Sequence, residues 1–334
     1  MDSFRLNTEG KYALGLDLGG TTMAAAVIDQ SGVIVGQVAS DVTPARSGAE
    51  AVATKLVSTL RRALESSQID PADLMGIGMA VPGQLKSSEG LVIFSPNFDW
   101  HNVNIARPVA EAFGLRTFIF NDVNTATLGE LWFGAGRAVD NMVMITLGTG
   151  IGGGVAIEGR VLAGPREAIG EIGHITLEPD GPRCECGNHG CFEALAGRDA
   201  LVGRAVRKLQ NARPSLLLEL VKGDLSAITP KAIAEAAQAG DEVALETLRE
   251  TAVYIGIALC TAINFADPDL IVIGGGIASA GDVLFEPIRA TIKTRARMIP
   301  YPPERVVPAE LGNLAGVYGG AVLVFQASGV AKPA

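Results

Sequence analysis

The chain has 334 residues, of which 48% are hydrophobic and 19% charged, and its formal net charge is −9. This length predicts two domains, and the hydrophobic share is enough for substantial cores. The acidic balance argues against broad attraction to nucleic acid or to an anionic membrane, because phosphate groups bind to a concentrated basic surface. We therefore expect neither kind of partner.

The chain shows no segment that predicts membrane insertion or export. Its longest apolar stretch, residues 251–266, is shorter than the roughly 20 residues that cross a bilayer, and Asp267 and Pro268 follow it directly. This stretch predicts a buried helix. The first eleven residues, MDSFRLNTEGK, lack the apolar core of a signal peptide, so we expect a cytoplasmic protein.

The N-terminal segment predicts three strands joined by tight turns, at 12–17, 23–28 and 33–38. The first strand ends at Asp17, and the turn after it contains Gly19, Gly20, Thr21 and Thr22. Glycines let backbone N–H groups approach an anion, threonines add hydroxyl donors, and Asp17 can hold a divalent cation through water. The turn is a candidate phosphate cradle, although a lone Gly-Gly turn is usually only a hairpin.

The next segment leads to a second polar strand end. We expect, in order, a helix at 49–67, strands at 75–81 and 91–95, a helix at 105–113 and a strand at 117–120. The last strand ends at Asn121-Asp122, and an acid at the carboxyl end of a buried strand lies where open α/β sheets bind ligands. Asp122 is therefore a candidate catalytic residue. It is equally a candidate cap for the helix expected at 125–132.

A second glycine turn repeats the layout of the first about 129 residues later. An apolar run at 142–145 leads to Thr149 and Gly150 within the turn TLGTGIG, and short strands follow at 155–157 and 161–162. Two related hairpins indicate a duplicated fold whose halves face each other across phosphates. The repeat favours phosphate binding by both turns.

Residues 170–193 concentrate three cysteines, Cys184, Cys186 and Cys191, with two histidines, His174 and His189. Three interpretations remain open: disulfides, a chance cluster of free thiols, and a four-coordinate zinc site. Disulfides would leave one of the three local thiols unpaired. The Cys-X-Cys spacing departs from the usual zinc-finger spacing, but the glycines in the loop allow the tight turns that a metal loop needs. Under the zinc interpretation, His174 is the expected fourth ligand.

The C-terminal part predicts helices followed by a glycine loop. We expect helices at 198–222, 229–238, 243–265, 283–297 and 315–325, strands at 270–273 and 306–311, and a frayed end at 327–334. The strand at 270–273 leads into Gly274, Gly275 and Gly276. Three consecutive glycines offer a floor without side chains for a nucleotide.

The order His174, Cys184-X-Cys186-Gly187-X-X-Gly190-Cys191-X-Glu193 resembles the signature of the ROK family, the bacterial sugar kinases and related repressors. The resemblance extends from residue 14 to about residue 321. It implies an α/β protein with the duplicated actin-like (RNase H-like) ATPase fold, in two domains around a cleft. Residues 1–121 with 312–334 would form the small domain, and residues 122–311 would form the large domain with the zinc loop.

The family also implies a role for each candidate residue. Asp122 would be the general base for a sugar hydroxyl, and the nucleotide would lie on the two glycine turns and the glycine loop. The residues implied in sugar binding are Asn97, Asn121, Asp122, Glu171, His174 and Glu193. The residues implied in nucleotide binding are Asp17, Gly19, Gly20, Thr21, Thr22, Thr149, Gly150, Gly274, Gly275 and Gly276. From the residues alone, Asn97 is equally a plain turn residue, and Glu171 and Glu193 could be solvated acids.

The expected activity is ATP- and Mg²⁺-dependent phosphorylation of a hexose, namely glucose at its 6-hydroxyl, with a structural Zn²⁺ on His174 and the three cysteines. Kinases for N-acetylmannosamine, N-acetylglucosamine or fructose stay open, as does a non-catalytic sugar sensor. Repressors of the family carry a DNA-reading domain ahead of the first glycine turn, and the sixteen residues before Asp17 are too few for one. By analogy with the family, we expect a homodimer or homotetramer.

Overall fold

The computed structural model describes residues 4–211 and 213–333, which form two compact units. Within the described residues, unit 1 covers 4–140, 156–169 and 310–333, and unit 2 covers 141–155 and 170–309. The domain division expected from the sequence stays a prediction. The compact units differ from it mainly in placing residues 122–140, with the helix that starts at Asp122, and residues 156–169 in unit 1.

The strands in the described residues form two five-stranded sheets with the same layout and a small three-stranded sheet. The first sheet has the order β3-β2-β1-β4-β8, with β1 Tyr12–Leu18, β2 Thr22–Asp29, β3 Ile34–Val42, β4 Leu74–Val81 and β8 Thr117–Asn121. The second has the order β11-β10-β9-β12-β13, with β9 Met142–Leu147, β10 Ile151–Ile157, β11 Arg160–Val161, β12 Leu270–Gly274 and β13 Val306–Pro308. In each sheet an antiparallel hairpin is extended by parallel strands. The repeat predicted from the two glycine turns is confirmed by this shared strand order.

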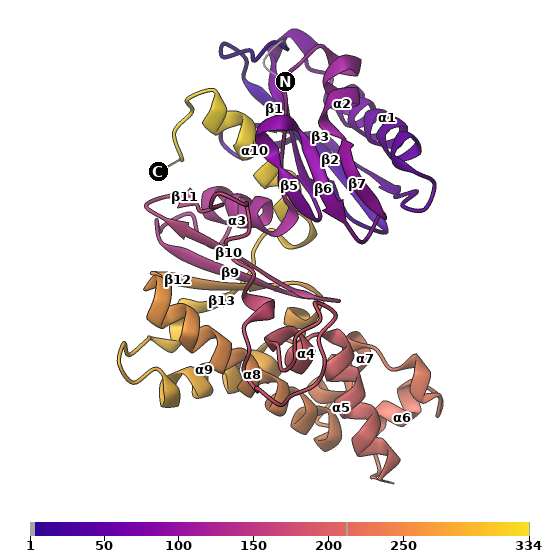
Figure 1. The fold of residues 1–334 in the computed structure, drawn as a ribbon, viewed down its shortest axis with the longest axis vertical. Coiled ribbons are helices and arrows are strands. Elements are labelled where there is room, and N and C mark those ends of the chain that lie inside the picture. The colour runs from indigo at the N-terminus through magenta and orange to yellow at the C-terminus, as the bar shows by residue number, and fades with distance from the viewer. Residues whose placement is uncertain (1–3, 212, 334) are drawn as a thin grey trace. The chain divides into compact units, whose positions relative to one another are not determined.

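Helices cover both faces of the first sheet (Figure 1). They are α1 Ala49–Ser67, α2 Ala106–Phe113, α3 Asp122–Phe133 and α10 Ala315–Ala327. Side chains alternate along β1, so Leu14 and Leu16 join the core that contains α1, while Gly15 lies against Val317 of α10. The predicted bounds of α1 are confirmed, because its apolar positions recur at helical spacing and are buried.

Helix α10 packs against backbone rather than against large side chains. A Cβ atom at Gly319 would lie 1.7 Å from the carbonyl oxygen of Thr125 in α3. A Cβ atom at Gly78 in β4 would lie 1.8 Å from the carbonyl oxygen of Gly320. Glycine is therefore required at these contacts, since no neighbouring side chain can move aside.

We expect Gly319→Ala to lower the free energy of unfolding by at least about 1–3 kcal/mol, because the added methyl must push two helices apart. Gly203 is the matched control. It also lies inside a helix, α5, but a Cβ there would meet nothing closer than the flexible Arg207 guanidinium at 3.4 Å. Gly203→Ala should raise stability by up to about 1 kcal/mol through helix propensity. Urea unfolding measures the change in unfolding free energy of each variant. The same change in both variants would contradict this packing of α10.

Within its described residues, unit 2 places six α-helices, a 3₁₀ turn before the cysteine loop and strands of the second sheet around one apolar core. The helices are α4 Phe192–Ala196, α5 Arg198–Gln210, α6 Leu216–Leu220, α7 Pro230–Gln238, α8 Glu242–Ala266, α9 Asp282–Arg295 and the 3₁₀ turn Ile172–His174. Helix α8 contributes a long buried face, and α9 packs beside it. The loop that carries the cysteines lies between the 3₁₀ turn and α4.

Several sequence predictions differ from these bounds. The helix expected at 198–222 is two helices, α5 and α6, because Pro214 cannot lie in a helix interior. The strand expected at 306–311 is shorter and ends at Pro308. The tail expected to fray is held in place as far as residue 333, since Lys332 Nζ donates to the carbonyl oxygens of Gly136 and Val139 at 3.4 and 2.6 Å. Ala334 lies outside the described residues.

The small sheet was missed apart from its central strand. It joins β5 Gln84–Lys86, β6 Leu91–Ser95 and β7 Trp100–Asn104 in unit 1. Its outer strands are mostly exposed and polar, so they give no apolar alternation.

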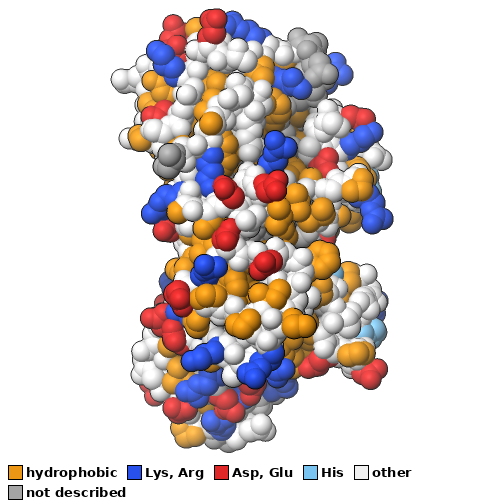
Figure 2. All heavy atoms as spheres, turned by 90° about the vertical axis from the view of Figure 1, so that its left-hand side faces the viewer, with side chains coloured by type: hydrophobic (Ala, Val, Ile, Leu, Met, Phe, Trp, Pro, Cys, Tyr) orange, Lys and Arg blue, Asp and Glu red, His pale blue; other side chains and the backbone are white. Residues whose placement is uncertain are grey.

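No helix in the described ranges is long and apolar enough to span a membrane. Figure 2 shows acidic, basic and apolar side chains interspersed on one face of the molecule.

Candidate active site

In unit 1, the parallel strands bring two acids to one edge of the first sheet. Asp17 near the end of β1 pairs with Ala80 in β4, and Val81 in turn pairs with Asn121 at the end of β8. Asp122 follows directly. The carboxyl ends of these strands therefore place Asp17 and Asp122 at the same edge, where open α/β sheets bind ligands.

The side chain that caps α3 belongs to Asn121. Its Oδ1 accepts hydrogen bonds from the backbone N–H groups of Val123 and Asn124 at 3.1 and 3.2 Å, and its Nδ2 donates to the carbonyl oxygen of Gly83 at 3.4 Å. Asn121 therefore occupies the N-cap position, although Asp122 Oδ1 also accepts a hydrogen bond from the backbone N–H of Val123 at 3.0 Å. Asp122 is the first residue of the helix and is half-buried. Asn121 was expected to contact sugar, and its side-chain amide oxygen Oδ1 is used here to cap the helix.

Asp17 lies in an environment that disfavours its charge. Burial, and secondarily the negative charge of Asp122, raise the pKa of Asp17 to about 7. Helix α10 approaches closely here, because a Cβ atom at Gly316 would lie 2.6 Å from the Asp17 carboxyl carbon. Two coupled carboxylates with one raised pKa form a donor set that suits a divalent cation, which would neutralise both.

This raised pKa predicts a pH-dependent cost of ionising Asp17 in the folded protein. Because the folded pKa exceeds the unfolded one, the stability contributed by protonated Asp17 is lost as pH rises toward and through 7. In magnesium-free buffer, the wild type should lose stability between pH 5 and pH 8 while Asp17→Asn does not. The unfolding free energy of the variant relative to the wild type should therefore rise by about 2–3 kcal/mol over this range. Urea unfolding at both pH values tests this, and a constant difference would contradict it.

The first glycine turn is held by backbone contacts and leaves its threonines exposed. The N–H of Gly19 donates to the carbonyl oxygen of Thr22 at 2.9 Å, and Thr43 Oγ1 donates to the carbonyl oxygen of Gly19 at 2.8 Å. A Cβ atom at Gly20 would lie 3.7 Å from the Asn97 side chain. The structure thus brings Asn97 to the turn, while Thr21 and Thr22 stay exposed.

In unit 2, the second glycine turn and the glycine loop share one edge of the second sheet. Thr146 in β9 pairs with Gly274 in β12, so Thr149-Gly150 and the loop 274–276 follow neighbouring strand ends. Gly275 has φ of 86°, and a Cβ there would lie 2.4 Å from the carbonyl oxygen of Leu147. A Cβ at Gly276 would meet nothing within 4 Å. This open backbone is the kind of floor on which a nucleotide can lie.

The structure gathers one nitrogen and three sulfur atoms in unit 2. Potential ligand atoms of His174, Cys184, Cys186 and Cys191 all lie within 4.8 Å of one another. Cys186 Sγ lies 3.7 Å from Cys191 Sγ, and Cys184 Sγ lies 3.7 Å from His174 Nδ1. A tetrahedral site with a metal–sulfur distance of about 2.3 Å has sulfur separations of roughly 3.8 Å. The four side chains therefore fit a metal ion.

The four cysteines are free thiols, and the fourth, Cys260, lies buried elsewhere. Burial is the main cause that raises the pKa of Cys191, to about 12, and that raises the pKa of Cys184. A bound cation would lower these pKa values and stabilise the thiolates. His189 is exposed, and its Nδ1 lies 3.3 Å from the carbonyl oxygen of Gly181, outside the cluster.

Glu193 connects the cluster to the second glycine turn. Its Oε2 accepts a hydrogen bond from the backbone N–H of Ile151 at 2.8 Å, and its Oε1 lies 3.9 Å from Cys184 Sγ. A Cβ at Gly150 would lie 2.5 Å from the same carboxylate. Glu171 is more exposed, and its Oε2 lies 3.9 Å from His174 Nε2. Glu171, before the cysteine loop, therefore lies close to His174, and Glu193, after it, lies close to Cys184.

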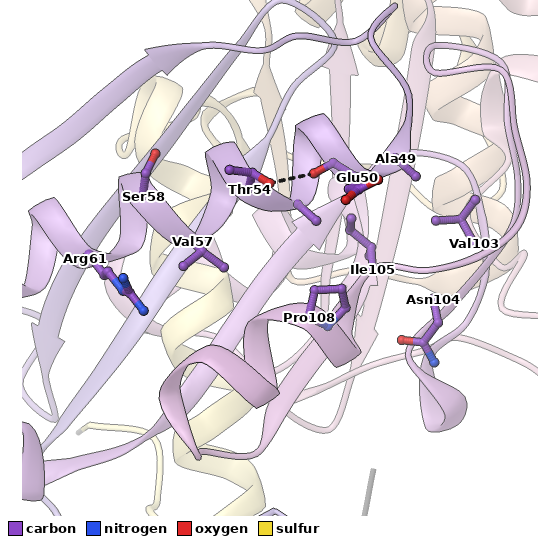
Figure 3. Close-up of a pocket in the computed structure, with 11 residues that line it drawn as sticks. Ala49, Glu50, Thr54, Val57, Ser58, Arg61, Val103, Asn104, Ile105 and Pro108 are labelled. Atoms are coloured by element: carbon purple, nitrogen blue, oxygen red, sulfur yellow. Dashed lines mark hydrogen bonds between the residues drawn. The ribbon is translucent and has the colours of Figure 1, made fainter.

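Two features of unit 1 were not found from the sequence. One is the close approach of Gly316 in α10 to Asp17. The only sequence signal for it was the high share of small residues in that helix. The other is a separate groove of about 540 Å³ beside α1, drawn in Figure 3, whose lining includes no residue predicted to bind sugar, nucleotide or metal. The residues that line it are Ala49, Glu50, Ala53, Thr54, Val57, Ser58, Arg61, Val103, Asn104, Ile105 and Pro108.

Comparison with known proteins places this site in a family. The profile of the ROK family matches residues 13–327. The chain belongs to the ROK family. The duplicated ATPase fold expected from the family signature is confirmed by the ROK sugar kinases among its structural neighbours.

Individual ROK relatives include both kinases and repressors. The glucokinase of Thermotoga maritima is 38% identical over 318 residues, which are 95% of this chain and 98% of that protein. A ROK family glucokinase from Streptomyces griseus, solved in complex with glucose and AMPPNP, has a TM-score of 0.81 and 34% identity, covering 94% of this chain and 99% of that one. The xylose repressor of Caldicellulosiruptor bescii is 28% identical over 81% of this chain and 67% of the repressor.

Proposed function

We propose that this ROK protein is an ATP-dependent hexokinase that phosphorylates glucose at its 6-hydroxyl. The observation that carries the proposal is the polar edge of unit 1, where Asn121 caps α3 and Asp122 follows at the end of β8. Similarity to glucokinases over nearly their whole length supports it, as does the relative solved with glucose and AMPPNP.

Asp122 is the proposed general base. A sugar hydroxyl that attacks the terminal phosphorus of ATP must lose its proton as the new bond forms, and a carboxylate within hydrogen-bond reach can accept it. The cap by Asn121 fixes the start of α3 and with it the position of this carboxylate. Asn121 then acts through Asp122 as well as on the sugar.

Backbone N–H groups and hydroxyls of the two glycine turns are proposed to hold the phosphates, with the adenosine on residues 274–276. Most of the remaining catalysis is positioning and charge neutralisation. Mg²⁺ would be held at Asp17, where it supplies neutralisation of the phosphate charge. The raised pKa of Asp17 supports this assignment, because a nearby cation restores the ionised carboxylate.

The cysteine cluster is proposed to bind one structural Zn²⁺ through His174, Cys184, Cys186 and Cys191. Thiolates and an imidazole are the ligands that zinc prefers, and four protein ligands leave no open position for water. His174 Nδ1 lies toward the sulfur atoms and its Nε2 toward Glu171. The same ring can therefore serve the metal and, with the two glutamates, the hydroxyls of the sugar. Asn97 is proposed as a further sugar contact.

A coupled assay for ADP release across a hexose panel tests the proposed function. We expect turnover with glucose and magnesium-ATP. Turnover only with an N-acetylhexosamine or fructose would reassign the substrate. Sugar binding without ADP release would instead favour a sugar sensor, in line with the similarity to repressors. The homodimer or homotetramer expected from the family stays a prediction that sedimentation tests.

A further inference from the structure

A side chain of α8 anchors the loop that carries the cysteines from outside the metal cluster. Tyr254 of α8 donates its hydroxyl proton to Oε1 of Glu178 at 2.6 Å. Glu178 lies within the loop, four residues after His174. Glu178 and Tyr254 are both half-buried. A short hydrogen bond to a carboxylate is among the stronger kinds of side-chain contact.

Glu178 is joined through its backbone to the residue before Cys191. The N–H groups of Leu177 and Glu178 both donate to the carbonyl oxygen of Gly190, at 2.8 and 3.3 Å. Gly190 has φ of 62°, and a Cβ there would lie 1.5 Å from the Glu178 carbonyl oxygen. The chain segments at 177–178 and at Gly190 are therefore in contact. A contact that holds Glu178 in place also restrains Cys191, which follows Gly190.

Arg204 of α5 connects the same anchor to the far end of the loop. Its guanidinium lies 5.3 Å from the centre of the Tyr254 ring, where a cation–π contact is favourable. It donates to the carbonyl oxygen of Leu195 in α4 at 2.6 Å and to Thr251 Oγ1 at 2.8 Å. Its side chain is only 12% exposed and also faces Glu250 at 3.7 Å. Helix α4 carries Glu193, so Arg204 restrains this acid from the other side.

We infer that Arg204, Tyr254 and Glu178 form a positioning trio that holds the cysteine loop, and with it Glu193 and His174, in place for the sugar. The inference rests on the proposed function only for its effect on the sugar. The trio touches none of the reacting groups. It fixes the loop from α5 and α8, which are rigid elements of the unit 2 core, independently of the metal.

The test uses the full chain and a readout that needs neither metal nor catalysis. In Tyr254→Phe, hydrogen–deuterium exchange of peptides covering residues 175–191 should rise about tenfold, because the bond to the carboxylate is lost while the ring stays under Arg204. The KM for glucose should rise about tenfold, with kcat within twofold and the KM for ATP unchanged. Tyr301→Phe is the matched control, since it removes a tyrosine hydroxyl in unit 2 that donates only a long hydrogen bond, of 3.5 Å, to the backbone carbonyl oxygen of Arg305.

Conservative and paired variants separate positioning from general damage. Glu178→Gln keeps an accepting oxygen and should exchange nearly as the wild type does, whereas Glu178→Ala should match Tyr254→Phe. The double variant Tyr254→Phe/Glu178→Ala should show no further increase. Unchanged loop exchange in Tyr254→Phe, or additive effects in the double variant, would overturn the inference. A wild type that releases no ADP would refute the proposed function and leave the exchange result valid.

Discussion

Replacing Asp122 with asparagine should lower kcat for glucose phosphorylation by about 10²–10⁴, the range typical of a lost general base. Asparagine keeps the size and the helix start but cannot accept the proton. Glucose affinity should stay within about tenfold, because the other sugar-binding groups are unchanged. Steady-state kinetics with glucose and magnesium-ATP, and glucose titration by calorimetry, measure the two effects separately.

Asp282 provides the matched control for this substitution. It is also the first residue of a helix, α9, but its side chain is 88% exposed and its nearest cation is Arg289 at 3.8 Å. Asp282→Asn should leave kcat within twofold. Retained activity in Asp122→Asn would show that another group takes the proton.

Removing one metal ligand should have the second large effect. In Cys191→Ala, we expect the zinc content to fall from about one per chain to near zero, since three ligands do not close a tetrahedral site. The KM for glucose should rise by about 10- to 100-fold, a range typical for the loss of groups that orient a metal site. Elemental analysis and steady-state kinetics measure the two quantities.

Cys260→Ala is the control for Cys191→Ala, because both cysteines are buried and only Cys191 lies in the cluster. The control should keep its zinc and its KM. Unit 2 has its own apolar core, so loss of the metal should loosen the loop before the unit unfolds. A zinc-free wild type with full activity would contradict the assignment.

Features fixed by local pattern were predictable from the sequence. The bounds of α1 follow from apolar positions at helical spacing, and the shared layout of the two sheets follows from the repeated glycine turn. The gathering of the three cysteines with His174 was expected under the zinc interpretation and is seen in the structure.

Features that depend on long-range contacts were not predictable. Asn121 and Asp122 are equally good caps by residue type, and only the backbone geometry shows that Asn121 has that role. The strand Trp100–Asn104 exists because it pairs with β6, although its own side chains are mostly polar and exposed. The Tyr254–Glu178 contact joins residues 76 positions apart, and no local pattern signals it.

A crystal structure of this chain with glucose and AMPPNP would show directly whether Asp122 is the base. We expect an Asp122 carboxylate oxygen within hydrogen-bond reach, about 2.6–3.2 Å, of the glucose 6-hydroxyl oxygen. If both ligands are bound and that carboxylate lies beyond hydrogen-bond reach of every sugar hydroxyl, Asp122 is not the base and the proposed mechanism is wrong.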